Sequence, residues 1–155
     1  MNGIGTVEAI HTAPEAEHPM ESKNVVRAVA EKGLRGDRYF KQAGTFSDVP
    51  RGGLEITFTE AEAIEAIVRE ADIALGFADH RRNITTRDAA LNHLVGERFR
   101  VGDAVCEGVR LCEPCDHLRR LTADGVIEAL AHRGGLRAEI VESGTIRVGD
   151  ALEPL

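Results

Sequence analysis

The chain has 155 residues, a length that fits one domain over residues 1–155. Its 43% hydrophobic and 29% charged residues are typical of a soluble folded protein. Only 4% of the residues are aromatic and there is no tryptophan, so the stacking platform of a single-strand nucleic-acid binder is not expected. The net charge of −7 argues against a phosphate-backbone partner and against an anionic membrane surface.

The N-terminal stretch lacks the basic segment followed by an apolar segment that marks a signal peptide. No apolar run approaches the roughly 18 residues that a membrane span requires. The cysteines are Cys106, Cys112 and Cys115, and an odd count without a signal peptide indicates free thiols in a reducing compartment. We therefore expect a cytoplasmic protein with no membrane and no nucleic-acid partner.

The first part of the chain reads as strands joined by loops. Residues 3–12 and 24–31 are predicted strands, and the second runs into a turn at 32–37 that is punctuated by two glycines. Residues 40–53 are rich in glycine and proline and are predicted to form an exposed loop. Residues 54–59 alternate apolar and polar side chains, which predicts a half-buried strand.

A helix is predicted over residues 60–75. Thr59 and Glu62 have the spacing of a capping box. Apolar residues then recur at intervals of three and four and form one stripe, which consists of Ile64, Ile67, Val68, Ala71 and Leu75. Such a stripe is typical of a helix packed on a sheet, and we expect no functional role for it.

The second part of the chain again reads mostly as strands. Residues 97–101 and 104–112 are predicted strands joined at a Gly-Asp turn, and residues 116–131 suggest one or two short helices. Residues 136–148 have the form of a hairpin with Gly144 at its turn. Residues 100–105 resemble residues 147–152, and turn chemistry explains this echo because each Gly-Asp can form a tight turn between barrel strands.

The densest group of reactive residue types lies at residues 111–120, where Cys112 and Cys115 flank Pro114. A cysteine at the start of a helix has its thiolate stabilised, so Cys115 is a candidate nucleophile or soft-metal ligand. The alternatives are a dithiol redox site, a zinc site and two inert buried thiols. The motif lies late in the chain for a redox site, and a second ligand pair for zinc is missing. Cys106 lies within a strand and is predicted to be a small core residue.

Two further segments gather arginine within an acidic chain. Arg81, Arg82 and Asn83 precede the strand-like residues 84–86, where paired guanidinium groups suit a planar anion or phosphate. The alternative is a solvated charge pair at a strand edge.

The second of these segments runs from Arg133 through Gly134 and Gly135 to Arg137, where paired glycines let backbone N–H groups approach a ligand. The alternative for this segment is a plain turn. Local positive charge of this kind favours a small anionic ligand.

Taken together, four segments resemble the MOSC family, which is named for the C-terminal domain of molybdenum-cofactor sulfurases. They occur in the family's order and span about residues 3–153. The segments are the Gly-Asp turn at 33–38 with Asp37 and Arg38, the Arg-x-Asn-Ile entry at 81–84, the cysteine segment at 112–115, and the closing Gly-Gly to Gly-Asp stretch at 134–150.

The resemblance implies a mainly β (α+β) fold, a distorted β-barrel with a few short helices. It also implies binding of a molybdopterin-type molybdenum cofactor, with Cys115 ligating molybdenum or carrying sulfur. Candidate cofactor contacts are Arg81, Arg82, Asn83, Arg133, Gly134, Gly135, Arg137, Cys112, Asp37 and Arg38, the last two as a pocket-rim or structural pair.

Two kinds of activity follow from the resemblance. One is reduction of N-hydroxylated compounds with electrons from an electron-transfer partner. The other is delivery of cofactor or sulfur to an accepting enzyme. The chain lacks the extra domains of better-studied relatives, so a homodimer is one way to complete the pocket. A non-catalytic carrier or interaction module is the alternative.

Overall fold

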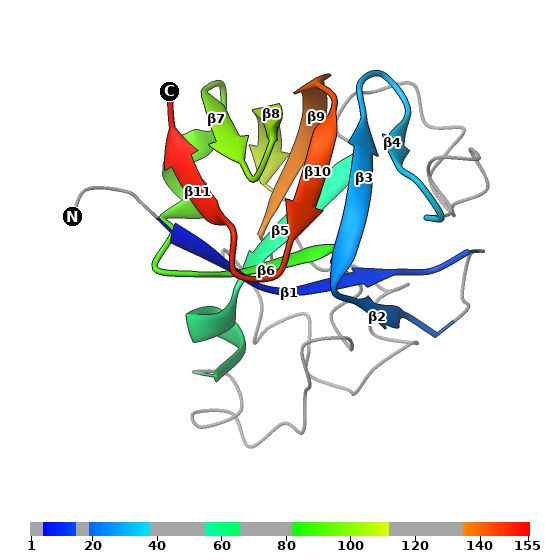
Figure 1. The fold of residues 1–155 in the computed structure, drawn as a ribbon. Coiled ribbons are helices and arrows are strands. Elements are labelled where there is room, and N and C mark those ends of the chain that lie inside the picture. Colours follow the sequence, from blue (N-terminus) through cyan, green and yellow to red (C-terminus); the bar gives the residue numbers. More distant parts are fainter. Residues whose placement is uncertain (1–4, 15–18, 38–54, 66–81, 112–134) are drawn as a thin grey trace.

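The computed structural model describes residues 5–14, 19–37, 55–65, 82–111 and 135–155 (Figure 1). These residues form eleven strands, a short 3-10 helix and the start of a helix at 61–65. The labelled elements are β1 (Gly5–Thr12), β2 (Glu21–Lys23), β3 (Val25–Val29), β4 (Gly33–Leu34), β5 (Ile56–Glu60), β6 (Ile84–Arg87), η1 (Leu91–Leu94), β7 (Arg98–Val101), β8 (Ala104–Leu111), β9 (Leu136–Glu142), β10 (Gly144–Arg147) and β11 (Ala151–Pro154).

The main sheet closes into a barrel. Its strand order is β11-β7-β8-β9-β5-β6-β1-β2, and an additional pairing of β11 with β1 closes a ring of seven strands from which β2 extends. Closure joins the two ends of the described chain, since Gly5 pairs with Leu152 and Thr6 with Ala151. A closed barrel leaves no unpaired edge along its seven strands. The expected mainly β barrel with few helices is confirmed for the part of the chain that the structure describes.

The C-terminal strands differ from the predicted hairpin over residues 136–148. β9 pairs with β5 and β8 in the barrel, whereas β10 pairs with β3 in a separate sheet of order β10-β3-β4 (Figure 1). The chain changes sheets at Ser143, whose Oγ accepts a hydrogen bond of 2.8 Å from the Ala30 N–H. At the next residue, a Cβ on Gly144 would lie 2.3 Å from the carbonyl carbon of Asp103. The hairpin prediction is therefore wrong: Gly144 allows close contact between backbones and is not the turn of a hairpin.

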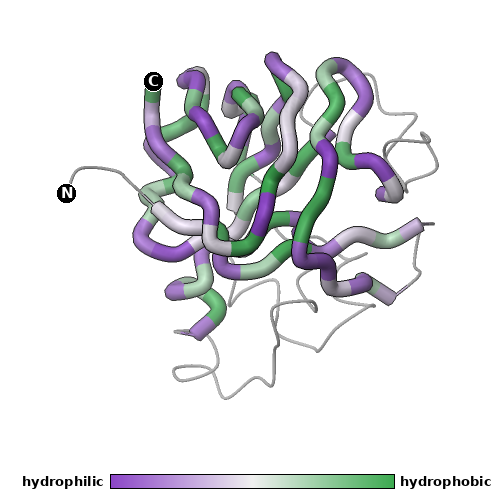
Figure 2. The backbone as a smooth tube through the Cα atoms, in the orientation of Figure 1, coloured by the Kyte–Doolittle hydropathy of each residue, from purple (hydrophilic) through white to green (hydrophobic). Residues whose placement is uncertain are grey.

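A row of apolar side chains from five strands packs in the barrel interior. The register pairs Leu111 with Leu136, Leu136 with Phe58, Phe58 with Ile84, and Ile84 with Ile10. Apart from Leu111, all of these residues are fully buried, and Phe58 meets Phe99 edge to face at a centroid distance of 5.3 Å. Figure 2 shows how hydrophobic and hydrophilic residues alternate along the strands. Because directly opposed residues share a face, the neighbouring positions in each strand point out of the barrel.

The strand predicted at 54–59 is buried on both faces and not on one. Ile56 and Phe58 face the interior, yet the outward Thr57 and Thr59 are also buried, at 5% and 0% exposure. β5 lies in the middle of the sheet, paired parallel with β6 and antiparallel with β9. A central strand next to a parallel neighbour is commonly covered on both sides.

The helix at 61–65 begins as predicted, and Ile64 of the apolar stripe is 1% exposed. The rest of the predicted helix lies outside the described residues. The capping box is wrong: the Thr59 hydroxyl has no hydrogen-bond partner among the described residues. Glu62 instead accepts a hydrogen bond of 2.7 Å from the Asp88 N–H. Thr59 still belongs to β5, so its hydroxyl does not cap the helix.

The two Gly-Asp turns are confirmed, and they lie against each other. The first joins β7 to β8 and the second joins β10 to β11. The Gly102 N–H donates to the Ala151 carbonyl at 3.1 Å, and Arg147 lies 3.6 Å from the Asp103 carboxylate. The sequence echo therefore corresponds to two adjacent turns at one end of the barrel.

Truncation of Phe58 to alanine should lower the free energy of unfolding by about 3–5 kcal/mol, because it leaves a cavity beside Phe99 in the barrel interior. Val148→Ala is the control, since Val148 is 44% exposed and its truncation should change stability by less than about 0.5 kcal/mol. Urea unfolding of both variants measures the difference. A loss below about 1 kcal/mol for Phe58→Ala would contradict a packed barrel interior.

Candidate functional site

A row of polar side chains lies on the outer face of the barrel, next to the apolar row inside. The register pairs Arg110 with Arg137 and Arg137 with Thr57. Thr57 contacts Asn83, and the His11 N–H donates to the Asn83 carbonyl at 2.7 Å. We call these five residues the polar row. They bring together Asn83 and Arg137, which come from two of the segments that the sequence singled out.

Asn83 is the hydrogen-bonding centre of this row. Its side-chain oxygen accepts from the Thr57 N–H at 3.1 Å and from the Thr57 hydroxyl at 3.0 Å. Its side-chain nitrogen donates to the His11 carbonyl at 3.1 Å and to Asp37 Oδ1 at 3.3 Å. Asp37 Oδ1 also accepts from the Ala13 N–H at 3.1 Å. Both donors and both acceptor sites of the amide are thus used inside the protein, which makes Asn83 a positioning residue for β1, β5 and β6.

Asp37 is fully buried and belongs to the same hydrogen-bond network. It follows Gly36, whose φ of +91° is in the left-handed region that favours glycine. The Gly-Leu-x-Gly-Asp turn therefore delivers a carboxylate to Asn83 and to the end of β1. Arg38, its predicted companion, lies outside the described residues.

Arg82 is 6% exposed, so it is not the solvated charge that the alternative interpretation predicted. A buried guanidinium is normally paired or hydrogen-bonded. It directly precedes Asn83 at the entry to β6. Its role as an anion contact stays a prediction, as does that of Arg81, which lies outside the described residues.

Arg137 and Arg110 are half-buried and lie directly opposite each other on β9 and β8. Like charges directly opposite each other across two strands repel, and Arg110 also has an interaction within the protein. No ion pair of Arg137 is found within the described residues. Arg110 was missed by the sequence analysis, although its place just before the Leu111-Cys112 step is the signal that could have identified it.

Gly135 lies where the chain re-enters the barrel. Its φ is +110°, and a Cβ at this position would lie 1.9 Å from the carbonyl oxygen of Phe58. The sequence analysis expected its missing side chain to admit a ligand. The structure gives a structural reason for a glycine here, because the chain passes close to the backbone of β5 where it enters β9.

The remaining predicted residues, Cys112, Cys115, Arg133 and Gly134, lie outside the described residues. The chain positions on either side of this segment are nevertheless described. Leu111, the last residue of β8, pairs with Leu136, the first residue of β9. The cysteine-bearing segment therefore leaves and rejoins the barrel beside the Arg110–Arg137 pair.

Cys106 is the cysteine that the structure describes, and it is fully buried. Burial raises the pKa of its thiol, and the Glu55 carboxylate adds to this effect. A protonated thiol in an apolar interior is a poor nucleophile and a poor metal ligand. Its predicted role as a small core residue is confirmed.

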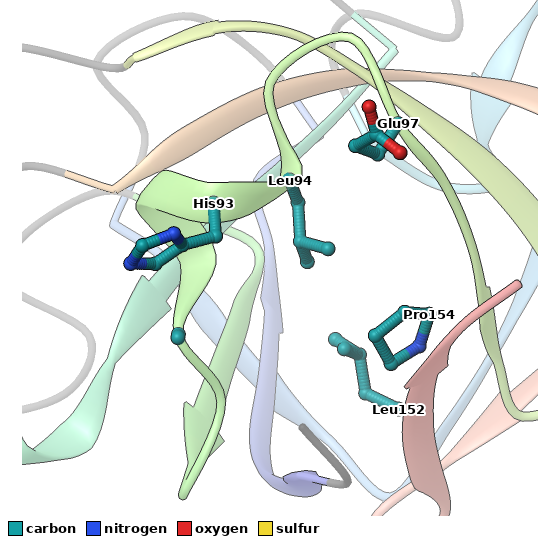
Figure 3. Close-up of a pocket in the computed structure, with 6 residues that line it drawn as sticks. His93, Leu94, Glu97, Leu152 and Pro154 are labelled. Carbon is teal, nitrogen blue, oxygen red and sulfur yellow. The ribbon is translucent and has the colours of Figure 1, made fainter. Parts of the chain in front are cut away.

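A separate small pocket of about 220 Å³ lies between η1 and β11 (Figure 3). Leu94, Leu152 and Pro154 form its apolar part, while His93 and Glu97 carry its polar groups. None of the predicted site residues that the structure describes lines this pocket.

No group of three or more His, Cys, Asp or Glu side chains in the described part of the chain could hold a metal ion. No helix there is long and apolar enough to cross a membrane.

Comparison with known proteins identifies related folds. Residues 54–153 match the MOSC domain family. YuaD from Bacillus subtilis superposes with a TM-score of 0.80 at 14% identity, over 96% of this chain and 94% of that protein. YiiM from Geobacillus stearothermophilus gives 0.73 at 12% identity, over 97% and 75% of the two chains. YiiM from Escherichia coli gives 0.67 at 16% identity, over 97% and 69%. No curated protein matches the sequence significantly.

Asn83→Ala should lower the free energy of unfolding by about 3 kcal/mol or more, because it leaves buried donors and acceptors on β1 and β5 unpaired. Asn24→Ala is the matched control, since Asn24 is exposed and uses only its backbone carbonyl in the contact with Val148. Thermal and urea unfolding measure both variants. Equal stability of the two would show that the Asn83 network does not hold the strands.

Proposed function

Since this chain belongs to the MOSC domain family, we propose that it binds a molybdopterin-type molybdenum cofactor, with Cys115 as the ligand of molybdenum or the carrier of sulfur. The observation that supports this proposal best is the Arg110–Arg137 pair. It lies on the outer face of the barrel at the two strand ends between which the cysteine segment runs.

The chemistry of these residues fits such a cofactor. Guanidinium groups bind phosphate through planar, bidentate hydrogen bonds, and the pterin carries a phosphate. Molybdenum is soft enough to accept a thiolate, which Cys115 would supply from the segment that follows Leu111. When bound, the cofactor supplies two-electron redox chemistry at the metal, while the protein binds and orients it.

The predicted residues divide into contacts and positioning residues. We propose that Arg137 and Arg110 hold the phosphate and that Arg82 adds positive charge at the entry to β6. Asn83 and Asp37 position the strands on which these contacts lie, and their hydrogen bonds leave the Asn83 amide no free group for a ligand. The segments outside the described residues would add Arg38, Arg81, Cys112, Arg133 and Gly134 to the cofactor contacts.

For the activity we propose reduction of N-hydroxylated compounds or delivery of cofactor or sulfur. The first requires an electron-transfer partner and the second an enzyme that accepts the cofactor. Both suit the reducing cytoplasm, which keeps the thiol of Cys115 free. A second copy of the chain would complete the pocket if one barrel leaves the cofactor partly open. A carrier without catalysis is the alternative.

Cys115→Ser should abolish bound molybdenum, whereas Cys112→Ser should retain most of it, because a hydroxyl is a much harder ligand than a thiolate. The measurement is metal and pterin analysis of protein purified from a host that makes the cofactor. Wild-type protein free of both metal and pterin would refute cofactor binding. Equal losses from both variants would indicate a dithiol or zinc site.

Turnover with an artificial electron donor separates a reductase from a carrier. A reductase that holds the cofactor should convert an N-hydroxylated substrate when electrons are supplied, and Cys115→Ser should lower this rate to background. A carrier should give no turnover but should restore activity to a cofactor-free molybdenum enzyme. Reduction at the same rate by Cys115→Ser would remove Cys115 from the reaction.

A further inference from the structure

The pocket between η1 and β11 is a cavity that the proposed function leaves unused (Figure 3). Its volume of about 220 Å³ is below the roughly 300–1,000 Å³ of sites that enclose a drug-sized molecule. A molybdopterin-type cofactor is therefore too large for this pocket, whereas a group the size of one aliphatic side chain fits. Neither Arg110 nor Arg137 lines it, so the pocket is separate from the site proposed for the cofactor.

The floor of the pocket is apolar and already packed. Leu152 and Pro154 occupy alternate positions of β11, so both point to the same side of the strand. Leu94 of η1 faces them across the pocket (Figure 3). Both leucines are buried, because η1 and the closing strand of the barrel pack on the core. An alkyl group that leaves water for this floor gains free energy in proportion to its apolar area.

Glu97 lies at the rim of the pocket on a backbone that is held from both sides. Its N–H donates to the Leu94 carbonyl at 3.0 Å, and its own carbonyl accepts from the Gly108 N–H at 3.0 Å. A Cβ on Gly108 would overlap the Leu94 carbonyl oxygen, so this glycine lets the end of η1 lie directly against β8. The fold therefore fixes the point from which the Glu97 side chain extends beside the apolar floor.

The Glu97 carboxylate has no charged partner in the part of the chain that the structure describes. Its neighbour Arg98 pairs instead with Glu107, at 3.2 Å. His93 lies on the other side of Leu94 and closes the pocket there (Figure 3). An anionic ligand would be repelled by the carboxylate, and an uncharged alkyl group would leave it unused. An alkyl chain that ends in an ammonium group matches both floor and rim, because ammonium is a compact cation that donates hydrogen bonds.

We propose that this pocket binds a primary aliphatic ammonium group. The alkyl chain lies on Leu94, Leu152 and Pro154, and the ammonium donates to the Glu97 carboxylate. Free alkylamines and the lysine side chains of other proteins both carry this group. The site is independent of the proposed cofactor site, and it was not visible in the sequence because its residues come from separate strands and a short helix.

Titration of the ¹⁵N-labelled full chain with n-butylammonium chloride tests the site by NMR. We expect saturable shifts of the backbone amides of His93, Glu97 and Leu152. n-Butanol and butyrate carry comparable alkyl chains without the positive charge, and each should bind about three- to fivefold more weakly, as expected for loss of a solvent-exposed ion pair. Equal binding of the three ligands, or shifts that do not saturate, would overturn the proposal.

Two variants and a matched control separate charge from shape. Glu97→Gln should weaken binding of n-butylammonium about three- to fivefold and leave n-butanol unaffected. Ala90→Leu places a larger side chain in the lining and should abolish saturable binding of both ligands. Glu153→Gln is the control, because Glu153 is exposed on β11 between Leu152 and Pro154 and points to the opposite side. An equal loss in Glu153→Gln and Glu97→Gln would mean that the ligand senses only net charge, which overturns the proposal, as does unchanged binding by Ala90→Leu.

Nα-Acetyl-lysine methylamide distinguishes the two sources of the ammonium group, since it carries the same chain on a peptide backbone. Binding at least as tight as that of n-butylammonium assigns the pocket to a lysine side chain of a partner protein. Weaker binding assigns it to a free alkylamine. Failure of both ligands to bind the wild-type protein would refute the ammonium site and would leave the proposed cofactor binding untouched.

Discussion

The side-chain amide of Asn83 is the constraint on which the described barrel depends. It sits at the entry to β6, between β1 and β5. Three of its four hydrogen bonds reach His11 on β1 and Thr57 on β5, and the fourth reaches Asp37. β5 and β6 form the one parallel ladder among the described strands, and parallel strands cannot be joined by a tight hairpin. The hydrogen bonds of the amide help to fix the register between β5 and β6, as a short turn does between the strands of a hairpin. The amide thereby links β1, β5 and β6.

Alternation of apolar and polar residues made most of the strands predictable. It also identified Cys106 as a core residue, and the glycines marked the turns at 32–37 and the two Gly-Asp corners. The prediction of a hairpin at 136–148 is wrong because a strand–glycine–strand pattern indicates only that the chain turns. It does not indicate which strands will pair with the two that flank the glycine. The partners of β9 and β10 come from segments that are distant in the sequence.

The sequence identified the segments that come together at the site. It did not show which of their residues are free to contact a ligand and which hold the fold together. An asparagine beside two arginines suggests a ligand contact, and the fold uses its amide entirely for internal hydrogen bonds. Gly135 looked like an opening for a ligand, and the fold uses it to bring two backbones together. Arg110 was hidden because its significance depends on Arg137 across the sheet. The role of each of these residues depends on which residues lie opposite it in the neighbouring strands, and a single sequence does not contain that information.

The outward face of β1, β5 and β6 carries both hydrogen-bonded and unpaired polar groups. Its hydrogen-bonded members, Thr57 and Asn83, stabilise the fold, while His11 Nδ1 and Thr59 Oγ1 have no hydrogen-bond partner among the described residues. This arrangement permits substitutions at the unpaired positions without dismantling the network beside them.

Closure of the barrel has a consequence for the order of events during synthesis. Gly5 pairs with Leu152, so the first and last described strands are neighbours in space although almost the whole sequence separates them. A nascent chain therefore exposes both edges of an open sheet until residues 151–154 leave the ribosome. Contacts of such high sequence separation form slowly, because the entropy of a long loop is lost before they form. Until then the unpaired edges of β1 and β7 are open to pairing with other chains, so the risk of aggregation is highest in this interval.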